Sequence, residues 1–265
     1  MRYSVITINF NNQEGLRRTV ESVVQQTCTD YEYIVIDGAS TDGSREVIGE
    51  YDSKIDYWVS EKDRGIYHAM NKGVAQAHGD YCLFLNSGDT FHDSRVLERV
   101  THVAATEDVI VGRVVIDGHG HTISPPPEGE LTLYHLYAGA IPHQGSFIRT
   151  ALLRKYPYDE TLKISSDWKF FVQTLIIDNC SVRFIDEPVA CYDMGGISAT
   201  QPDLMRAEKD EVLATMFPPR VLADYRQMKL SECLTQKLTP RLRVNYGIDR
   251  ILYRIGRLLL KLRQT

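Results

Sequence analysis

The sequence predicts an α/β fold, in which a mostly parallel β-sheet is covered by helices. Three observations support this prediction. Short apolar stretches alternate with amphipathic stretches over the first hundred residues, and polar turns separate the two kinds. Within each apolar stretch the apolar residues follow one another without interruption. Continuous apolar runs are typical of parallel strands buried on both faces, and the alternation is typical of strands joined by helices.

The elements can be placed in order along the chain. Residues 3–9 form the first strand, and Asn12 or Asn11 caps a helix that reaches about Gln26, because Asn accepts hydrogen bonds from the first helical amides. The next predicted elements are strand 33–37, helix 45–51, strand 57–60, helix 68–77, strand 81–85 and helix 94–105. Further along we expect strands at 109–116, 144–149 and 182–185, a helix at 167–177, and helices from 203 onward.

The organisation predicted is one α/β domain, residues 1–200, and a helical extension, residues 201–265. The last 25 residues carry seven Lys or Arg and one Asp, a net charge of +6, whereas the preceding 240 residues carry a net charge of −11. A nucleic-acid binder would place its positive charge on the folded body. We therefore expect no nucleic-acid partner, and interpret the protein as an acidic domain with a basic amphipathic tail.

Several other classes are disfavoured by the sequence. Its five cysteines form no CxxC pair, which argues against a disulfide framework or a structural zinc site and favours a reducing cytosol. Neither a secretory leader nor an apolar run of membrane-spanning length is present, so we expect a cytoplasmic protein. The first strand is not followed by GxGxxG, and no GxxxxGK[ST] occurs, which disfavours a dinucleotide oxidoreductase and a P-loop nucleotidase.

Acidic side chains stand where two predicted strands end. Asp37 closes the second strand, and Asp89 follows the fourth in the turn Asn86-Ser87-Gly88-Asp89. In parallel sheets ligands bind beyond the carboxyl ends of the strands. Such carboxylates can take a nucleobase N–H or a ribose hydroxyl, and an Asn/Asp pair in a glycine turn can hold a divalent ion through oxygens. Capping of a turn or helix is the alternative for each residue taken singly.

Five segments together carry a resemblance. SVITINFNN, YIVIDGASTDGS, EKDRGIYHAMNKG, GDYCLFLNSGDTF and SSDWKFF occur in the order, and at roughly the spacing, of family 2 glycosyltransferases. The chain resembles the branch that builds colanic-acid-like exopolysaccharides and other surface glycans, over about residues 3–195. The resemblance implies the GT-A fold, a Rossmann-like sheet flanked by helices, and transfer from a nucleotide diphosphate sugar with inversion at the anomeric carbon.

The resemblance also implies roles for individual residues. Asp37 matches the carboxylate that reads the base, Asp89 stands at the family's metal-binding DxD, and Asp167 matches the general base. The residues expected to bind the nucleotide or donor are Thr7, Asn9, Asn11, Asp37, Asp63, Arg64, Gly65, Asn71, Lys72, Asn86 and Ser87. The expected cofactor is a divalent metal, Mg²⁺ or Mn²⁺, and the expected donor carries UDP or GDP.

Two departures from the family pattern affect the metal. The common DDGS is Asp37-Gly38-Ala39-Ser40 here, and the DxD is NSGD, so one carboxylate remains in each motif. We therefore expect the ion to take most of its ligands from diphosphate and water. The alternative for Asp167 is a structural one, because an acid in the first turn of a helix is favoured by the helix dipole.

Four histidines in or near these segments are interpreted in three ways. His143 and Gln144 precede an apolar strand, and we expect them on the acceptor side, with a His satisfied within a turn as the alternative. His68 is interpreted as either structural or donor-tuning. His119 and His121 have metal-like spacing in a Pro/Gly loop, but no third ligand lies nearby in the sequence, so a mobile loop is favoured.

The basic tail has an apolar stripe at helical spacing. Basic residues repeat every three to four positions on its other faces, a pattern that fits a helix lying on an anionic membrane. Packing on the protein's own body or in a homodimer is the alternative. The stripe consists of Ile248, Ile251, Leu252, Ile255, Leu258, Leu259 and Leu262.

The sequence therefore predicts a metal-dependent hexosyltransferase acting on a lipid-linked glycan at the inner face of the cell membrane, in surface polysaccharide biosynthesis. A non-catalytic nucleotide-sugar-binding subunit is the alternative from a different class, since the DxD is incomplete. A nucleotide-sugar oxidoreductase or epimerase is a second alternative, disfavoured by the absence of glycines after the first strand.

Overall fold

The computed structural model describes residues 3–103, 106–116, 122–123, 130–196 and 200–230. Its strands are β1 (Tyr3–Asn9), β2 (Tyr31–Asp37), β3 (Tyr57–Ser60), β4 (Tyr81–Phe84), β5 (Thr90–Phe91), β6 (Val109–Ile116), β7 (Thr122–Ile123), β8 (Ser146–Arg149) and β9 (Val182–Tyr192). Its α-helices are α1 (Gln13–Val24), α2 (Ser44–Glu50), α3 (Ile66–Gln76), α4 (Val96–Val103), α5 (Leu133–Ala138), α6 (Thr150–Lys155), α7 (Ser166–Phe171) and α9 (Pro202–Met216). Short 3-10 turns lie at Asp52–Lys54 and His143–Gly145, and a π-helical segment follows α7 at Val172–Ile177.

The described strands form one mixed sheet in the order β3-β2-β1-β4-β8-β6-β9-β5, with β7 beside β6. Strands β3, β2, β1 and β4 are parallel, as predicted. Antiparallel pairing begins at β8, which lies between β4 and β6. The α/β fold class is confirmed, and parallel pairing is concentrated in the first half of the chain.

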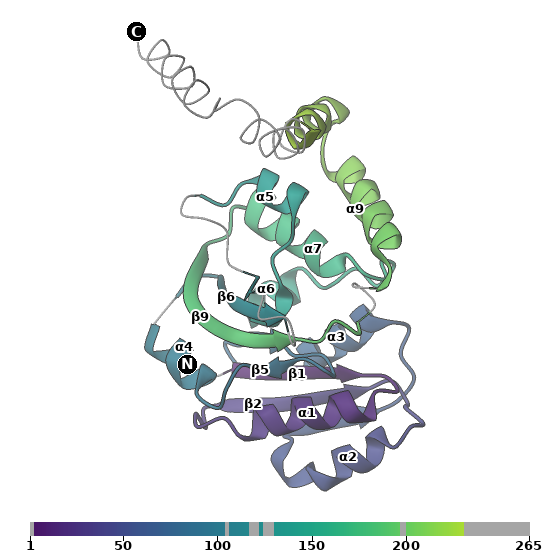
Figure 1. The fold of residues 1–265 in the computed structure, drawn as a ribbon, viewed down its shortest axis with the longest axis vertical. Helices are drawn as coiled ribbons and strands as arrows, with labels where there is room; N and C mark the ends of the chain where they lie inside the picture. Colours follow the sequence, from purple (N-terminus) through teal and green to yellow (C-terminus); the bar gives the residue numbers. More distant parts are fainter. Residues whose placement is uncertain (1–2, 104–105, 117–121, 124–129, 197–199, 231–265) are drawn as a thin grey trace, which may run out of the picture. The chain divides into compact units, whose positions relative to one another are not determined.

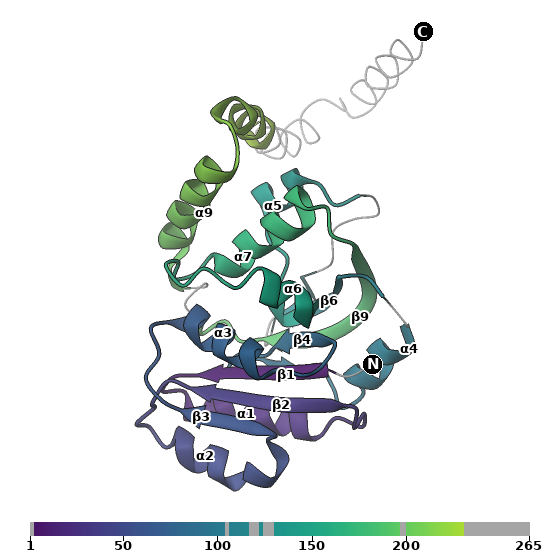
Figure 2. The same cartoon turned by 180° about the vertical axis from the view of Figure 1, so that it is seen from behind.

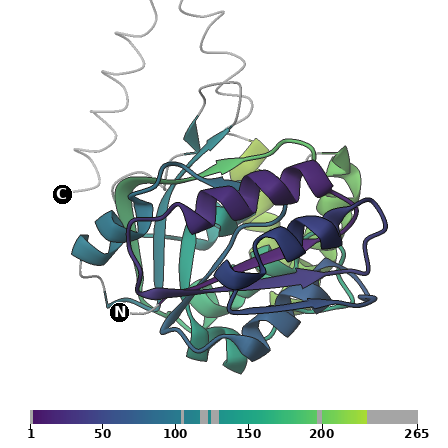
Figure 3. The same cartoon turned by 90° about the horizontal axis from the view of Figure 1, so that it is seen from below.

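Helices cover both faces of the parallel strands. Figures 1 and 2 view the molecule from opposite sides, and they show α1 over one face of the strands and α3 over the other. Figure 3, seen from below, also shows α1 on one side of the strands. Leu16, Val20 and Val23 of α1 join Val5 of β1 in one core cluster. Helix α3 lies close to the sheet because Gly73 has no side chain: a Cβ there would lie 2.5 Å from Cγ2 of Ile6.

The first helix begins as its sequence predicts. Asn12 is the N-cap of α1, and its Oδ1 accepts a hydrogen bond from the backbone N–H of Gly15 at 3.1 Å. Its Nδ2 reaches in the other direction and donates to the carbonyl oxygen of Ser87 at 2.9 Å. The cap therefore also joins the start of α1 to the turn that follows β4.

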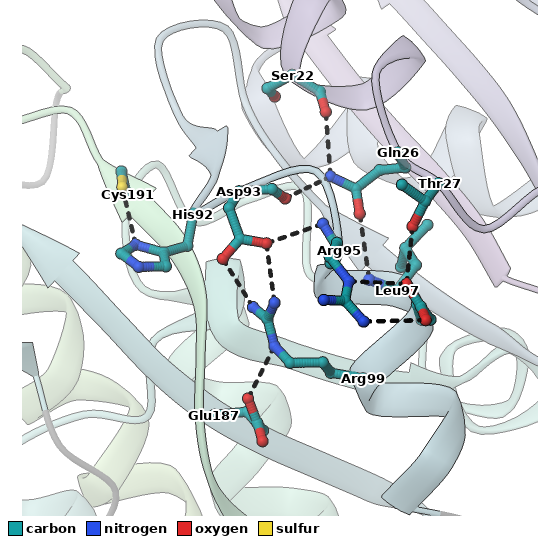
Figure 4. Close-up of polar contacts among 11 residues, drawn as sticks. Ser22, Gln26, Thr27, His92, Asp93, Arg95, Leu97, Arg99, Glu187 and Cys191 are labelled. Carbon is teal, nitrogen blue, oxygen red and sulfur yellow. Dashed lines mark hydrogen bonds and ion pairs between the residues drawn. The ribbon is translucent and has the colours of Figure 1, made fainter.

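The long strand β9 is joined to α1 and α4 through a polar network (Figure 4). Arg99 of α4 donates to Glu187 of β9 at 3.0 Å and makes two bonds to the carboxylate of Asp93 at 2.9 and 3.0 Å. The side chain of Gln26 donates to the carbonyl of Asp93 and accepts from the amide of Leu97. Strand β9, predicted only as residues 182–185, extends to Tyr192 and pairs with β5 and β6.

The chain divides into two compact units, Met1–Val212 and Leu213–Thr265. The division falls within α9, and residues 219–230 of the second unit are helical. The predicted boundary after residue 200 stays a prediction. Within the residues that the structure describes, no helix has the length and apolarity needed to cross a membrane. The apolar stripe of the tail, His119 and His121 lie outside the described residues.

Candidate active site

The carboxyl ends of β1, β2 and β3 meet at one edge of the sheet. Asn9 is paired with Asp37, and Asp37 with Ser60, in the strand register. The next residue along, Gly38, lies against two neighbouring loops: a Cβ there would be 3.1 Å from the Phe10 ring and 3.5 Å from Oδ2 of Asp63. The loops that follow these three strands therefore converge, as the parallel order predicts.

The side chain of Asp37 is fully buried and accepts hydrogen bonds from the side chains around it. Oδ1 accepts from Nδ2 of Asn9 at 2.8 Å and from Oγ of Ser40 at 2.5 Å, and Oδ2 accepts from Oγ of Ser60 at 2.6 Å. Burial alone would raise the pKa of this carboxyl group, but the hydrogen bonds from Ser40, Ser60 and Asn9 lower it. In this structure Asp37 holds the loop after β2, and contact with a base stays a prediction.

The loop after β1 is held in a left-handed conformation. Asn11 has a φ of 47°, its N–H donates to Oγ of Ser40 at 2.8 Å, and its Oδ1 accepts from the amide of Thr41 at 2.9 Å. Ala39 opposite has a φ of 61°. Non-glycine residues in this region store strain and cluster at ligand-binding loops. Phe10, between Asn9 and Asn11, exposes 68% of its surface.

Asp63 is paired with two side chains of α3. Its Oδ1 lies 2.9 Å from Nζ of Lys72 and 2.9 Å from Nδ1 of His68. Lys72 also pairs with Glu61 at 2.8 Å, and these carboxylates raise the pKa of Lys72 despite its partial burial. His68 therefore contacts Asp63 directly through its ring nitrogen.

Arg64 and Asn71 connect the start of α3 to the segment before α7. Asn71 exchanges two hydrogen bonds with the backbone of Tyr158, at 2.8 and 2.9 Å. Arg64 is ion-paired with Glu160. Gly65 precedes α3 with a φ of 145°, a left-handed value that favours glycine. The structure gives Asn71 a scaffold contact, and its predicted donor contact stays a prediction.

Asp167 lies in the first turn of α7 and is held by two side chains. Oδ1 accepts from the hydroxyl of Tyr67 at 2.8 Å, and Oδ2 lies 3.1 Å from Nδ1 of His143. Burial acts to raise the pKa of Asp167, but His143, Tyr67 and the amide of Trp168 lower it. Burial and the charge of Asp167 keep the pKa of Tyr67 well above 10, so its hydroxyl is a neutral donor.

His143 links Asp167 to the turn after β4. Because the ionised carboxylate only accepts, Nδ1 of His143 carries the proton that faces Asp167. Nε2 lies 3.3 Å from Nδ2 of Asn86 and accepts from it in the neutral tautomer. Burial favours the neutral ring, but the hydrogen bond and charge of Asp167, together with the charge of Asp89, raise the pKa of His143. Residues 86, 143 and 167, distant in sequence, thus form one connected group.

Asp89 is buried, and its carboxylate accepts few hydrogen bonds. It is 4% exposed, Oδ1 accepts from the amide of Asp193 at 3.0 Å, and the side chain of Gln144 also bonds to it. Burial raises the pKa of Asp89 to about 6. Among the described residues Oδ1 of Asn86 is buried without a hydrogen-bond partner. Asp89 and Asn86 therefore offer hard oxygen atoms that fit a divalent cation.

A complete protein-built metal site is not formed by the described residues, where no cluster of three or more His, Cys, Asp or Glu is found. A cation bound at Asp89 would need further oxygens from a diphosphate or water, as Mg²⁺ often takes.

The other predicted residues lie behind or beside this edge. Thr7 is fully buried in β1, and its hydroxyl lies 3.0 Å from that of Tyr33. Ser87 accepts from Asn12. Sequence reasoning missed Tyr67 as a partner of Asp167 and did not single out Phe10, although both lie inside quoted motifs. The signal for Tyr67 was its place in EKDRGIYHAMNKG, but only the fold shows that it reaches α7.

Comparison with known proteins places this chain in a family. A sequence model described as Glycosyl transferase family 2 matches residues 4–162, more than half of the chain, so the chain belongs to glycosyl transferase family 2. An uncharacterised glycosyltransferase of Mycobacterium tuberculosis is 34% identical over 183 residues, covering 66% of this chain and 69% of that protein. A Mycobacterium bovis protein named PGL/p-HBAD biosynthesis glycosyltransferase is 28% identical over 210 residues, covering 76% and 80%.

Solved structures confirm the GT-A fold. The S. aureus TarS 1-349 structure in complex with UDP-GlcNAc matches with a TM-score of 0.63 and 21% identity, over 80% of this chain and 67% of that one. The mannosyltransferase PcManGT from Pyrobaculum calidifontis, in complex with GDP-Man and Mn²⁺, matches with a TM-score of 0.60 and 15% identity, over 77% of this chain and 60% of that one. The chain thus spans about two thirds of one structure and 60% of the other.

Proposed function

We propose that this glycosyltransferase is an inverting enzyme that transfers a hexose-type sugar from a nucleotide diphosphate sugar, with Asp167 as the general base. The observation that carries the proposal is the group formed by Asp167, Tyr67, His143 and Asn86. It joins an ionised carboxylate to the turn that carries Asp89. A base for the acceptor and an acidic turn for the diphosphate are thereby near one another.

The chemistry follows from the lone pairs of Asp167. An ionised carboxylate has about four acceptor positions, and Tyr67, His143 and the amide of Trp168 occupy three of them. The remaining one can take the acceptor's hydroxyl proton as its oxygen attacks the anomeric carbon. The new C–O bond forms while the bond to the diphosphate breaks, so the nucleoside diphosphate leaves from the opposite face. Positioned proton removal of this kind is general-base catalysis.

The donor would lie along the edge formed by β1, β2 and β4. Phe10 offers an exposed ring beside Gly38 for a nucleobase. Lys72, paired with Asp63 and Glu61, and Arg64, paired with Glu160, can exchange these partners for donor phosphates. Asp89 would hold a divalent cation, Mg²⁺ or Mn²⁺, which would supply charge that offsets the departing diphosphate. UDP or GDP is the favoured carrier, since the two similar structures hold UDP-GlcNAc and GDP-Man.

The acceptor we propose is a lipid-linked glycan in surface polysaccharide biosynthesis, with the enzyme on the inner face of the cell membrane. Support comes from the basic amphipathic pattern of residues 241–265 and from the similarity to a mycobacterial enzyme named for PGL/p-HBAD biosynthesis. Truncation after Thr239 should lower binding to anionic liposomes and leave donor binding unchanged. Unchanged liposome binding, or a truncated chain that dimerises less, would favour packing on protein instead.

A thermal-shift panel tests the donor assignment. UDP-, GDP-, dTDP- and CMP-sugars are compared with and without Mn²⁺, on the wild type and on Asp186→Asn as a control on an exposed acid. One nucleotide class is expected to raise the melting temperature, more strongly with Mn²⁺. No shift with any of the four would contradict the proposal.

A non-catalytic nucleotide-sugar-binding subunit is the second candidate, favoured by the single carboxylate of the NSGD turn. Both candidates predict a thermal shift. Only the enzyme predicts release of the nucleoside diphosphate from the donor, strongly reduced by Asp167→Asn. Binding without turnover under any acceptor condition would favour the subunit.

A further inference from the structure

The loop that leads into helix α7 is held by a residue from a distant helix. Ser165 is its N-cap, yet no side-chain capping bond is made there. Glu208 of α9, only 8% exposed, takes the amides that lead into the helix. Its Oε1 accepts from Lys163 at 2.7 Å, and its Oε2 accepts from Ile164 and Ser165 at 3.0 Å each. An anion here also agrees with the helix dipole.

The next residue of α9 fixes the other side of Asp167. Nζ of Lys209 lies 4.9 Å from the centre of the Trp168 ring and 3.2 Å from the carbonyl oxygen of Gly139. Nε1 of Trp168 in turn donates to the carbonyl of Leu136 at 2.8 Å. The backbone before Asp167 therefore bonds to Glu208 of α9, and the Trp168 ring after it contacts Lys209 of the same helix.

We propose that Glu208 is the positioning residue for Asp167, an inference that rests on the function proposed above. Asp167 acts only where its carboxylate meets the acceptor hydroxyl, and its place is set by the backbone that leads into α7. Without the Glu208 carboxylate, three amides lose their acceptor, those of Ile164 and Ser165 in a buried setting, and the loop must rearrange to satisfy them. The rearrangement moves Asp167 relative to His143, while the donor-binding edge of β1 and β2 stays unchanged.

The first test needs no substrate. The Nδ1–H of His143 faces Asp167, so its proton NMR signal reports their separation. Glu208→Gln replaces one of the two accepting oxygens with an NH2 donor. It should shift this signal and speed hydrogen exchange, by roughly 10-fold, at those amides of residues 163–165 that lose their acceptor, the cost of one lost buried bond. Glu211→Gln makes the same chemical change at an exposed site on the same helix and should alter neither. An unmoved His143 signal in Glu208→Gln would overturn the proposal.

The second test separates kcat from KM, with UDP-GlcNAc and Mn²⁺ as the probe. Glu208→Gln should lower kcat by roughly 10- to 100-fold, as a small displacement of a catalytic group does, with an unchanged donor KM. Glu208→Asp keeps the charge and should give an intermediate kcat. A full kcat with a lower melting temperature would assign Glu208 a purely structural role.

The two proposals fail in different ways. If the wild type releases no UDP from this probe, or Asp167→Asn is fully active, the proposed function fails for this donor, and the NMR signal still decides the positioning of Asp167. If Glu208→Gln does not fold, Glu208→Asp carries both measurements.

Discussion

His143 and Asp167, 24 residues apart, face each other with Nδ1 and Oδ2 at 3.1 Å. The contact crosses from the 3-10 turn after Pro142 to the first turn of α7. It fixes which nitrogen of the ring carries the proton and raises the pKa of His143 while lowering that of Asp167. The sequence placed these residues in separate roles, acceptor contact and general base. The structure joins them.

Asp167→Asn tests the base directly. The amide keeps the shape of the side chain but cannot take a proton, so we expect transfer to fall by roughly 10²- to 10⁴-fold, the usual contribution of a general base. Donor affinity should stay within a few-fold, measured by calorimetry with the nucleotide sugar found in the thermal-shift panel. Loss of donor binding instead would give Asp167 a binding role.

Asp89→Asn should stabilise the metal-free protein. The pKa of Asp89 is raised from 3.8 to about 6, so at pH 7 its ionisation opposes folding by roughly 3 kcal/mol, at 1.36 kcal/mol for each pKa unit. The folded state binds more protons between these two values, so wild-type stability should rise as the pH falls from 7 towards 4. The Asp89→Asn variant has no charge at this position, so it avoids this free-energy cost at pH 7.

Urea unfolding in EDTA at pH 7 and pH 5 measures this difference. The gain of Asp89→Asn over the wild type should be larger at pH 7 than at pH 5, and Asp186→Asn should show no such gain. A less stable Asp89→Asn variant at pH 7 would contradict the assignment. The variant should also lose the Mn²⁺-dependent part of the nucleotide-sugar thermal shift.

Asp159→Asn should destabilise the protein with the opposite pH dependence. Burial acts to raise the pKa of Asp159, but bonds from Lys169 and Thr161 lower it to about 2. A depressed carboxyl pKa contributes stability above the unfolded value of 3.8, and the contribution is lost as the pH falls through 2. Allowing for partial exposure, we expect a loss of roughly 1–2 kcal/mol at pH 7.

The loss should be roughly halved at pH 3, where the unfolded carboxyl group is largely protonated. Equilibrium unfolding of the wild type and the variant at pH 7 and pH 3 measures this loss of stability. Asp203→Asn, on an acid that is 95% exposed, serves as the control and should change stability little. An equal loss at pH 7 and pH 3 would show that packing, rather than charge, explains the effect.

Phe10→Ala should weaken nucleotide binding without unfolding the domain. The ring is 68% exposed, so its removal costs little folding energy, whereas stacking of a base on an aromatic ring contributes roughly 1–3 kcal/mol. Phe10→Tyr keeps the ring and should bind like the wild type. Titration with UDP or GDP gives the affinities, and equal affinity in Phe10→Ala would place the base elsewhere.

Local patterns predicted the first half of the fold well. The strand Tyr3–Asn9, the Asn12 cap and the strand Tyr57–Ser60 have the bounds expected from the sequence. The helix predicted at 167–177 is α-helical only to Phe171 and π-helical beyond, which changes the bond spacing without changing the apolar pattern. Helices α5 and α6 were not predicted, because six residues are too few to show a helical period.

The sequence by itself determined the layered α/β fold, the family and the acidic residues at the strand ends, because strand and helix periods and motif order are local properties of the chain. Only the tertiary structure decided that Asp37 faces inward, that His143 joins Asp167 to Asn86, and that Glu208 holds the loop leading into α7 from another helix. Such contacts join residues far apart in sequence, so their geometry depends on packing of the whole sheet and its helices rather than on any local pattern.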